Sequence, residues 1–197
     1  NNFSLLSESD YQVLLPCSTD QFSSFISDLL GTPQTVEKDF NFPFEIKHED
    51  IVHIYNLVKQ RVENQNQGSL VQFCSKIHYS DDSVITLNSY NDFLNYTNIK
   101  ALDTTALTIT WVYLIKFNHS GAPQKQEITL HFQPINKFQS PFKDRHPESV
   151  LETGISFITL YIRHTDRSWG LDIESMLSGA LENYRISESP KRETIKK

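Results

Sequence analysis

The most constraining stretch of the sequence is the apolar run TALTITWVYLIKFN at residues 105–118. Large apolar side chains occupy alternate positions, which predicts a β-strand, because successive side chains of a strand point to opposite faces. The other positions include Val112 and Leu114, so both faces of this strand are partly apolar. Two-sided apolarity is typical of a strand with neighbours on both sides. We therefore expect a β-sheet with 105–118 as a central strand. The first face carries Leu107, Ile109, Trp111, Tyr113, Ile115 and Phe117.

The other apolar segments divide into strand patterns and helix patterns. Alternating or continuous short apolar runs bounded by turn residues predict strands, and spacings of three and four residues predict helices. The resulting order of elements favours an α+β fold, with a mixed, largely antiparallel sheet and about four helices packed on it. Strands are expected at 9–16, 35–46, 69–79, 84–89, 125–135 and 153–165, and helices at 18–31, 48–65, 89–97 and 166–184.

The length of 197 residues suits one domain with a sizeable core. We expect a single α+β domain over residues 1–184. Residues 185–197 hold five Lys or Arg against two Glu, which is typical of a flexible tail or of a linker on the cytoplasmic side of a membrane span. Residues 134–152 contain three prolines and are expected to form a long surface loop, a kind of segment that is often functional.

Composition argues against several classes of function. The net charge of -6 and the pI of about 5.6 disfavour bulk nucleic-acid binding, which requires a dense basic surface. The seven histidines form no HExxH motif and no i, i+4 pair on a helix, and the two cysteines form no CxxC motif, so no metal site is expected. Glycine-rich phosphate loops are absent from the sequence. We therefore expect no cofactor.

The densest cluster of chemically useful side chains is IRHTDRSWGLDIE, residues 162–174. Arg163, His164 and Asp166 fall at the end of a strand, where α/β folds often place ligands, so they are weak candidates for a catalytic site. Asp166 also suits the cap of the next helix, and Trp169 suits its apolar stripe. The structural interpretation of this corner is favoured over the catalytic one.

Aromatic residues provide the candidate binding residues. Tyr90, Phe93 and Tyr96 could line a pocket, although core packing explains most aromatic residues. The sequence favours Phe138, Phe142, Lys143, Arg145 and Trp169 as binding residues. A nucleotide-ligand receptor is an alternative that would require Lys137, Lys143, Arg145 and Arg163 to converge on one cleft.

No named family is recognised, but three short stretches resemble the soluble part of uncharacterised bacterial proteins that continue into a membrane anchor. The leading hypothesis is a non-enzymatic sensing or protein-interaction domain of a larger, membrane-anchored bacterial protein. It would lie in the cytoplasm, at the cytoplasmic face of a membrane, and bind a protein partner or a small ligand. The alternative is a hydrolase or nuclease that uses His164, Asp166 and Arg163. The three stretches are GTPQTVEKDFNFPFEI, SYNDFLNY and RSWGLDIESML.

Overall fold

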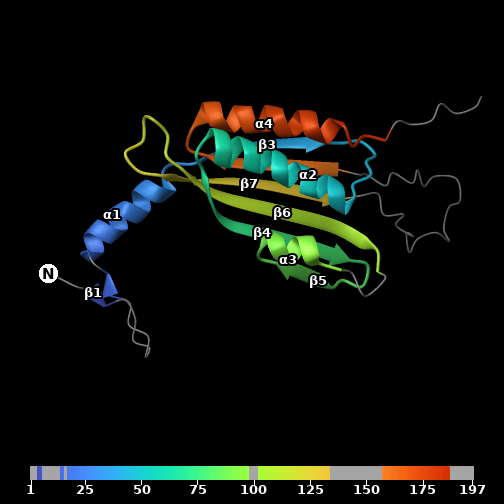
Figure 1. Ribbon diagram of the computed structural model, residues 1–197, viewed down its shortest axis with the longest axis horizontal. Coiled ribbons are helices and arrows are strands. Elements are labelled where there is room, and N and C mark those ends of the chain that lie inside the picture. Colours follow the sequence, from blue (N-terminus) through green and yellow to red (C-terminus); the bar gives the residue numbers. More distant parts are fainter. Residues whose placement is uncertain (1–3, 6–13, 16, 98–101, 134–156, 187–197) are drawn as a thin grey trace, which may run out of the picture.

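A six-stranded antiparallel sheet forms the centre of the computed structural model (Figure 1). The model describes residues 4–5, 14–15, 17–97, 102–133 and 157–186. Every pairing in this sheet is antiparallel, and the strand of the 105–118 run lies inside it, as expected. The spatial order is β3 (Gln34–Phe40), β8 (Phe157–His164), β7 (Gln124–Gln133), β6 (Thr104–Ile115), β4 (Ser69–Tyr79) and β5 (Val84–Leu87).

Three helices lie on one face of the sheet: α2 (His48–Lys59), α3 (Tyr90–Asn95) and α4 (Arg167–Glu182) (Figure 1). At its C-terminal end α2 continues as a short π-helix, η1 (Gln60–Gln65). The sequence pattern predicted one continuous helix over 48–65 and could not distinguish the two hydrogen-bonding patterns. The fold is α+β, as predicted. No helix of the described residues is long and apolar enough to cross a membrane.

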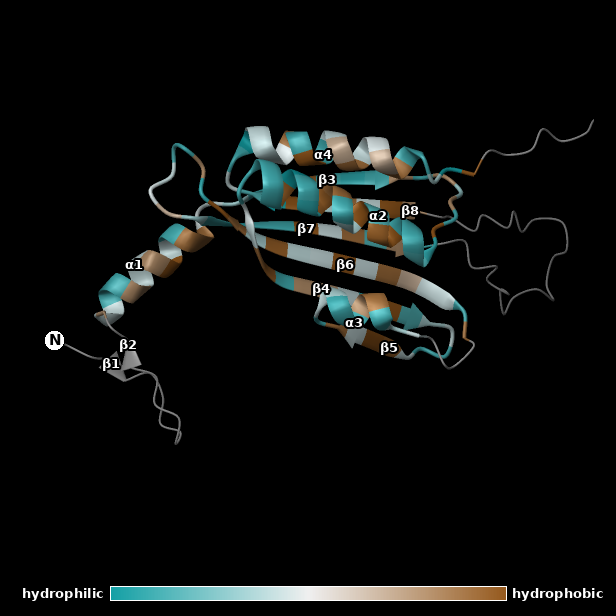
Figure 2. Ribbon diagram, viewed as in Figure 1, coloured by the Kyte–Doolittle hydropathy of each residue, from teal (hydrophilic) through white to brown (hydrophobic). Residues whose placement is uncertain are grey.

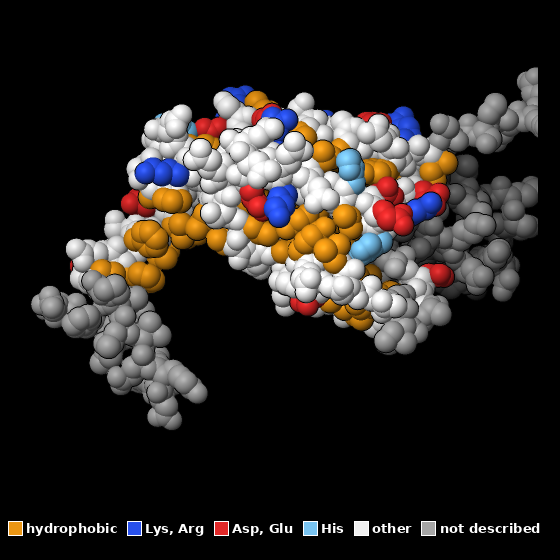
Figure 3. Space-filling view, in the orientation of Figure 1, with side chains coloured by type: hydrophobic (Ala, Val, Ile, Leu, Met, Phe, Trp, Pro, Cys, Tyr) orange, Lys and Arg blue, Asp and Glu red, His pale blue; other side chains and the backbone are white. Residues whose placement is uncertain are grey.

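The first helix, α1 (Thr19–Leu30), projects away from the sheet (Figure 1). Its N-terminus has a capping box, in which the Ser18 hydroxyl accepts from the Gln21 N–H and the Gln21 side chain accepts from the Ser18 N–H. The helix is amphipathic, yet it contains no buried residue. Phe25 is 51% exposed and Leu30 is 48% exposed. Figure 2 shows hydrophobic residues along α1, and Figure 3 shows hydrophobic side chains gathered on this helix. The small sheet before it pairs β1 (Ser4–Leu5) with β2 (Leu14–Leu15).

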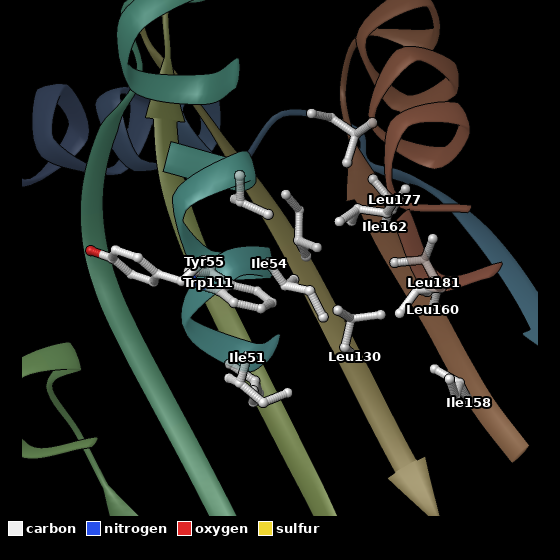
Figure 4. Packing of buried hydrophobic residues seen from close by; sticks show 14 of the residues in the cluster. Ile51, Ile54, Tyr55, Trp111, Leu130, Ile158, Leu160, Ile162, Leu177 and Leu181 are labelled. Carbon is white, nitrogen blue, oxygen red and sulfur yellow. The ribbon is translucent and has the colours of Figure 1, made fainter. Parts of the chain in front are cut away.

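The core lies between the sheet and the helices α2 and α4. Alternate residues of β7 and β8, and most of those of β6, face these helices and are buried, whereas most residues on the other face stay at least partly exposed. In Figure 4, Leu177 and Leu181 of α4 approach Leu160 and Ile162 of β8. Burying side chains of this size contributes about 1.5–3 kcal/mol each. The helix-facing rows therefore hold the two layers together.

Candidate functional site

The corner between β8 and α4 is held by hydrogen bonds that explain most of its polar residues. The buried Gln126 side chain accepts from the Thr165 N–H at 2.9 Å and donates to the Thr165 hydroxyl at 2.7 Å. Asp166 caps α4 by accepting from the Trp169 N–H at 2.7 Å. These contacts fix the direction in which the chain leaves the sheet, so the corner has a structural purpose, as the sequence favoured.

The three catalytic candidates of the corner do not converge. His164 is only 2% exposed and packs against Gly170 of α4. Burial lowers the pKa of His164, because the charged imidazolium loses water there. Arg163, the preceding residue of the strand, points to the opposite face, where it lines a cavity of about 280 Å³ with Lys125 and Glu127. One oxygen of the Asp166 carboxylate caps the helix, and the other lies 3.6 Å from Nδ1 of the exposed His119.

The remaining polar residues of this stretch connect α4 to two different elements. Asp172 forms an ion pair with Arg61 of η1, at 3.1 Å. Glu174 forms an ion pair with Lys38 of β3, and the hydrogen bond from Lys38 lowers the pKa of Glu174. Trp169, a binding candidate from the sequence, is 4% exposed and belongs to the core. Phe138, Phe142, Lys143 and Arg145, with Lys137, lie outside the described residues.

An apolar cavity of about 370 Å³ opens between the N-terminal end of α2, the helix α3 and the sheet. Figure 3 shows hydrophobic side chains gathered on this face between α2 and α3. We call this cavity the α2–α3 pocket. Its volume falls within the range of ligand sites, about 300–1,000 Å³. The residues that line it are Phe44, Glu45, Ile46, Lys47, His48, Ile51, Ile77, Phe93, Thr104, Leu107 and Phe132.

Two aromatic contacts fix the walls of the α2–α3 pocket. Phe44 packs edge-on against Phe132 of β7, with ring centroids 6.2 Å apart. His48, the first residue of α2, stacks on Phe93 of α3 at 4.8 Å and an interplanar angle of 18°. Because His48 and Phe93 come from different helices, their stacking joins the two sides of the pocket. The floor is apolar and includes Leu107, which is only partly buried.

Local interactions position the wall that α3 provides. The Ser89 hydroxyl accepts from the Asp92 N–H at 3.0 Å and starts the helix. Tyr90 stacks on Tyr55 of α2 with a centroid distance of 3.4 Å. The hydroxyl groups of Tyr79 and Tyr96 lie 2.9 Å apart at the other end of α3. Burial and this hydrogen bond raise the pKa of Tyr79 to about 12, so it stays neutral at pH 7.

Among the described residues that line the α2–α3 pocket, the charged side chains of Glu45 and Lys47 stand at its rim. Lys47 and Glu45 face each other at 3.7 Å and are both well exposed. The Lys47 N–H donates to Asp50 at 2.7 Å, which closes the first turn of α2. The arrangement can hold an apolar group and leave a polar end in water. Among the described residues, no group of three His, Cys, Asp or Glu could hold a metal ion.

The sequence identified Phe93 as a residue that could line a pocket, but it assigned Leu107 and Phe132 to the core faces of strands. Those assignments describe the strand faces correctly. The missing information is that α2 and α3 leave a cavity over this part of the sheet. An apolar strand face gives the same signal in both cases, so the pocket has no sequence motif of its own.

Comparisons with known proteins assign the chain to no family. No protein-family model matches the sequence, and no curated protein matches it. The function is therefore inferred from the geometry of the chain itself.

Proposed function

We propose that this chain is a non-catalytic sensing domain that binds an apolar small molecule in the α2–α3 pocket. The observation that supports the proposal is the apolar cavity of about 370 Å³, whose described charged lining residues, Glu45 and Lys47, stand at the rim. A ligand with an apolar body would remove from water its own apolar surface and that of the partly buried Ile46 and Leu107. Burial of apolar surface is the usual source of affinity at such sites.

The hydrolase or nuclease alternative has weaker support. General acid–base catalysis requires the acid, the base and the substrate within hydrogen-bonding distance. His164 lies beneath Gly170, and Arg163 points to the other face of β8. The nucleotide-receptor alternative would need cations gathered in one cleft, and of its four residues only Arg163 is described.

The test is a titration with anilinonaphthalene sulfonate, a dye with an apolar ring system. Fluorescence gives the affinity, and the amide shifts of an NMR spectrum locate the site. Leu107→Trp fills the pocket and should weaken binding at least about tenfold, or ~1.4 kcal/mol. Leu94→Trp is the matched control, because Leu94 is 40% exposed on α3 and does not line the pocket.

The proposal is wrong if the wild-type protein does not bind the dye, or if Leu107→Trp binds it as well as Leu94→Trp does. Circular dichroism should confirm that both variants keep the helical and strand content of the wild type. A dye that shifts amides all over the protein would also contradict a defined site.

We further propose that the domain belongs to a larger membrane-anchored bacterial protein and lies at the cytoplasmic face of the membrane. The support is the excess of Lys and Arg in residues 185–197, because basic segments next to membrane spans lie mostly in the cytoplasm. The test compares binding of the full chain to neutral vesicles and to vesicles with anionic lipid. Salt-sensitive binding only to the anionic vesicles is expected, and equal binding to both would refute this placement.

A further inference from the structure

The wall of the α2–α3 pocket is paired with the chain that leaves α4. Phe44 and Arg185 form an isolated antiparallel bridge. The Ile186 N–H donates to the Pro43 carbonyl at 2.9 Å, and the Glu45 N–H donates to the Tyr184 carbonyl at 3.4 Å. The segment 43–45 therefore touches the pocket through Phe44 and touches the exit of α4 through its backbone.

Phe42 and Phe44, the residues on either side of Pro43, face two different cavities. Phe44 lines the α2–α3 pocket. Phe42, two residues earlier, lines a cavity of about 390 Å³ between β3 and α4, together with Arg185. The Arg185 guanidinium lies 4.5 Å from the centre of the Phe42 ring and pairs with Glu182 at 3.2 Å. Both Phe42 and Phe44 are nearly buried, so the segment cannot shift without moving both rings.

We infer that occupancy of the α2–α3 pocket regulates the pairing of residues 184–186 with residues 43–45. An occupant adds contacts to the Phe44 ring and holds the extended backbone of 43–45 in place. This conformation is the one that pairs with Tyr184 and Ile186. Because coupling between two sites is reciprocal, loss of the pairing must weaken binding in the pocket by the same factor.

The pairing is suited to regulation because few interactions hold it. It consists of two backbone hydrogen bonds, one of which is long, and of a stacked Arg185 whose ion pair with Glu182 is about half exposed. Exposed ion pairs contribute little, and Ile186 itself is 46% exposed. An occupant that binds only slightly more tightly to the paired state therefore changes the population of that state.

This inference rests on the proposed function, because it requires an occupant of the α2–α3 pocket. It assigns to that occupant an effect on the polypeptide that follows α4. The state of the pocket would be communicated to residue 186 and onward along the chain.

The experiment uses the full chain, with anilinonaphthalene sulfonate as the probe. Ile186→Pro removes the N–H that donates to Pro43, and Ile186→Ala is the matched control that keeps it. We expect Ile186→Pro to bind the dye at least fivefold more weakly than Ile186→Ala, which should match the wild type. Saturating dye should also slow hydrogen exchange of the Glu45 and Ile186 amides in the wild type.

The outcomes separate the two ideas. If the dye binds in the pocket, as Leu107→Trp reports, but Ile186→Pro binds as tightly as Ile186→Ala, the coupling is refuted and the proposed function stands. Unchanged exchange of both amides on binding would likewise refute the coupling. If the wild type does not bind the dye, or Leu107→Trp does not weaken binding, the proposed function fails and the coupling fails with it.

Discussion

Replacement of Gly170 by alanine should destabilise the protein although it improves the helix propensity of α4. A Cβ at this position would lie 2.4 Å from Cδ2 of His164 and 2.7 Å from both Cγ and Nε2. Ordinary Cβ contacts are 3.4 Å or longer. The imidazole of His164 is nearly inaccessible to solvent. The helix or the ring must therefore move by about 1 Å, in a core packed as densely as a crystal.

The expected magnitude follows from two opposing terms. One extra methyl group in a filled core costs about 1–3 kcal/mol. The change from glycine to alanine inside a helix stabilises the helix by about 1 kcal/mol. Since the contact involves three atoms of a buried ring, we expect a packing cost in the upper part of this range. Gly170→Ala should lower the free energy of unfolding by about 1–2 kcal/mol.

The matched control is Gly179→Ala on the same helix, where a Cβ would have no neighbour within 4 Å. That variant should be more stable than the wild type by up to about 1 kcal/mol. Urea denaturation followed by circular dichroism measures both changes, provided that the m-value stays constant. A second check places Gly170→Ala in a His164→Ala background, where its cost should disappear. Equal stability of the two single variants would refute the close packing of β8 and α4.

Three further predictions test other parts of the structure. Because burial lowers the pKa of His164, the unfolded chain binds its proton first as the pH falls below about 6.5. The free energy of unfolding should then drop by at most about 1.4 kcal/mol per pH unit for this residue. A pH titration of stability should show a shallower decline in His164→Leu, and an unchanged slope would contradict this origin. Asp166→Ala should cost about 1–2 kcal/mol through loss of the α4 cap, whereas Asp166→Asn should cost much less, as measured by thermal or urea unfolding. Phe25→Ser should change the free energy of unfolding by less than about 0.5 kcal/mol, since α1 buries no residue; a larger loss would mean that α1 packs on the domain.

Local patterns were enough to predict most elements of the fold. The alternation in 105–118 identified an interior strand, and Asp166 was correctly interpreted as a helix cap. Each of these signals depends on side chains a few residues apart, whose relative directions are set by the element itself. The order of the strands depends on contacts between distant segments. The sequence predicted a mixed, largely antiparallel sheet, and every pairing in the six-stranded sheet is antiparallel, but the spatial order of its strands had no local signal.

The α2–α3 pocket illustrates what a single sequence does not reveal. Its lining comes from the segment before α2, from α2 and α3, and from β4, β6 and β7. Two aromatic pairs shape it, and in each pair the two partners are far apart in the sequence: Phe44 with Phe132, and His48 with Phe93. The same is true of Gly170, whose need for a small side chain becomes visible only when His164 is placed beneath it.

The position of the pocket follows from the lengths of the elements. From His48 to Gln65, α2 and η1 extend about 27 Å, which matches the stretch of β6 from Leu107 to Ile115, about 26 Å. Ile51 meets Leu107 at one end, and Gly68 brings Val62 and Ile115 together at the other. The six residues of α3 add only about 9 Å of cover. Among the described residues, the pocket lies where the start of β6, at Thr104 and Leu107, meets the first turn of α2 and the short helix α3.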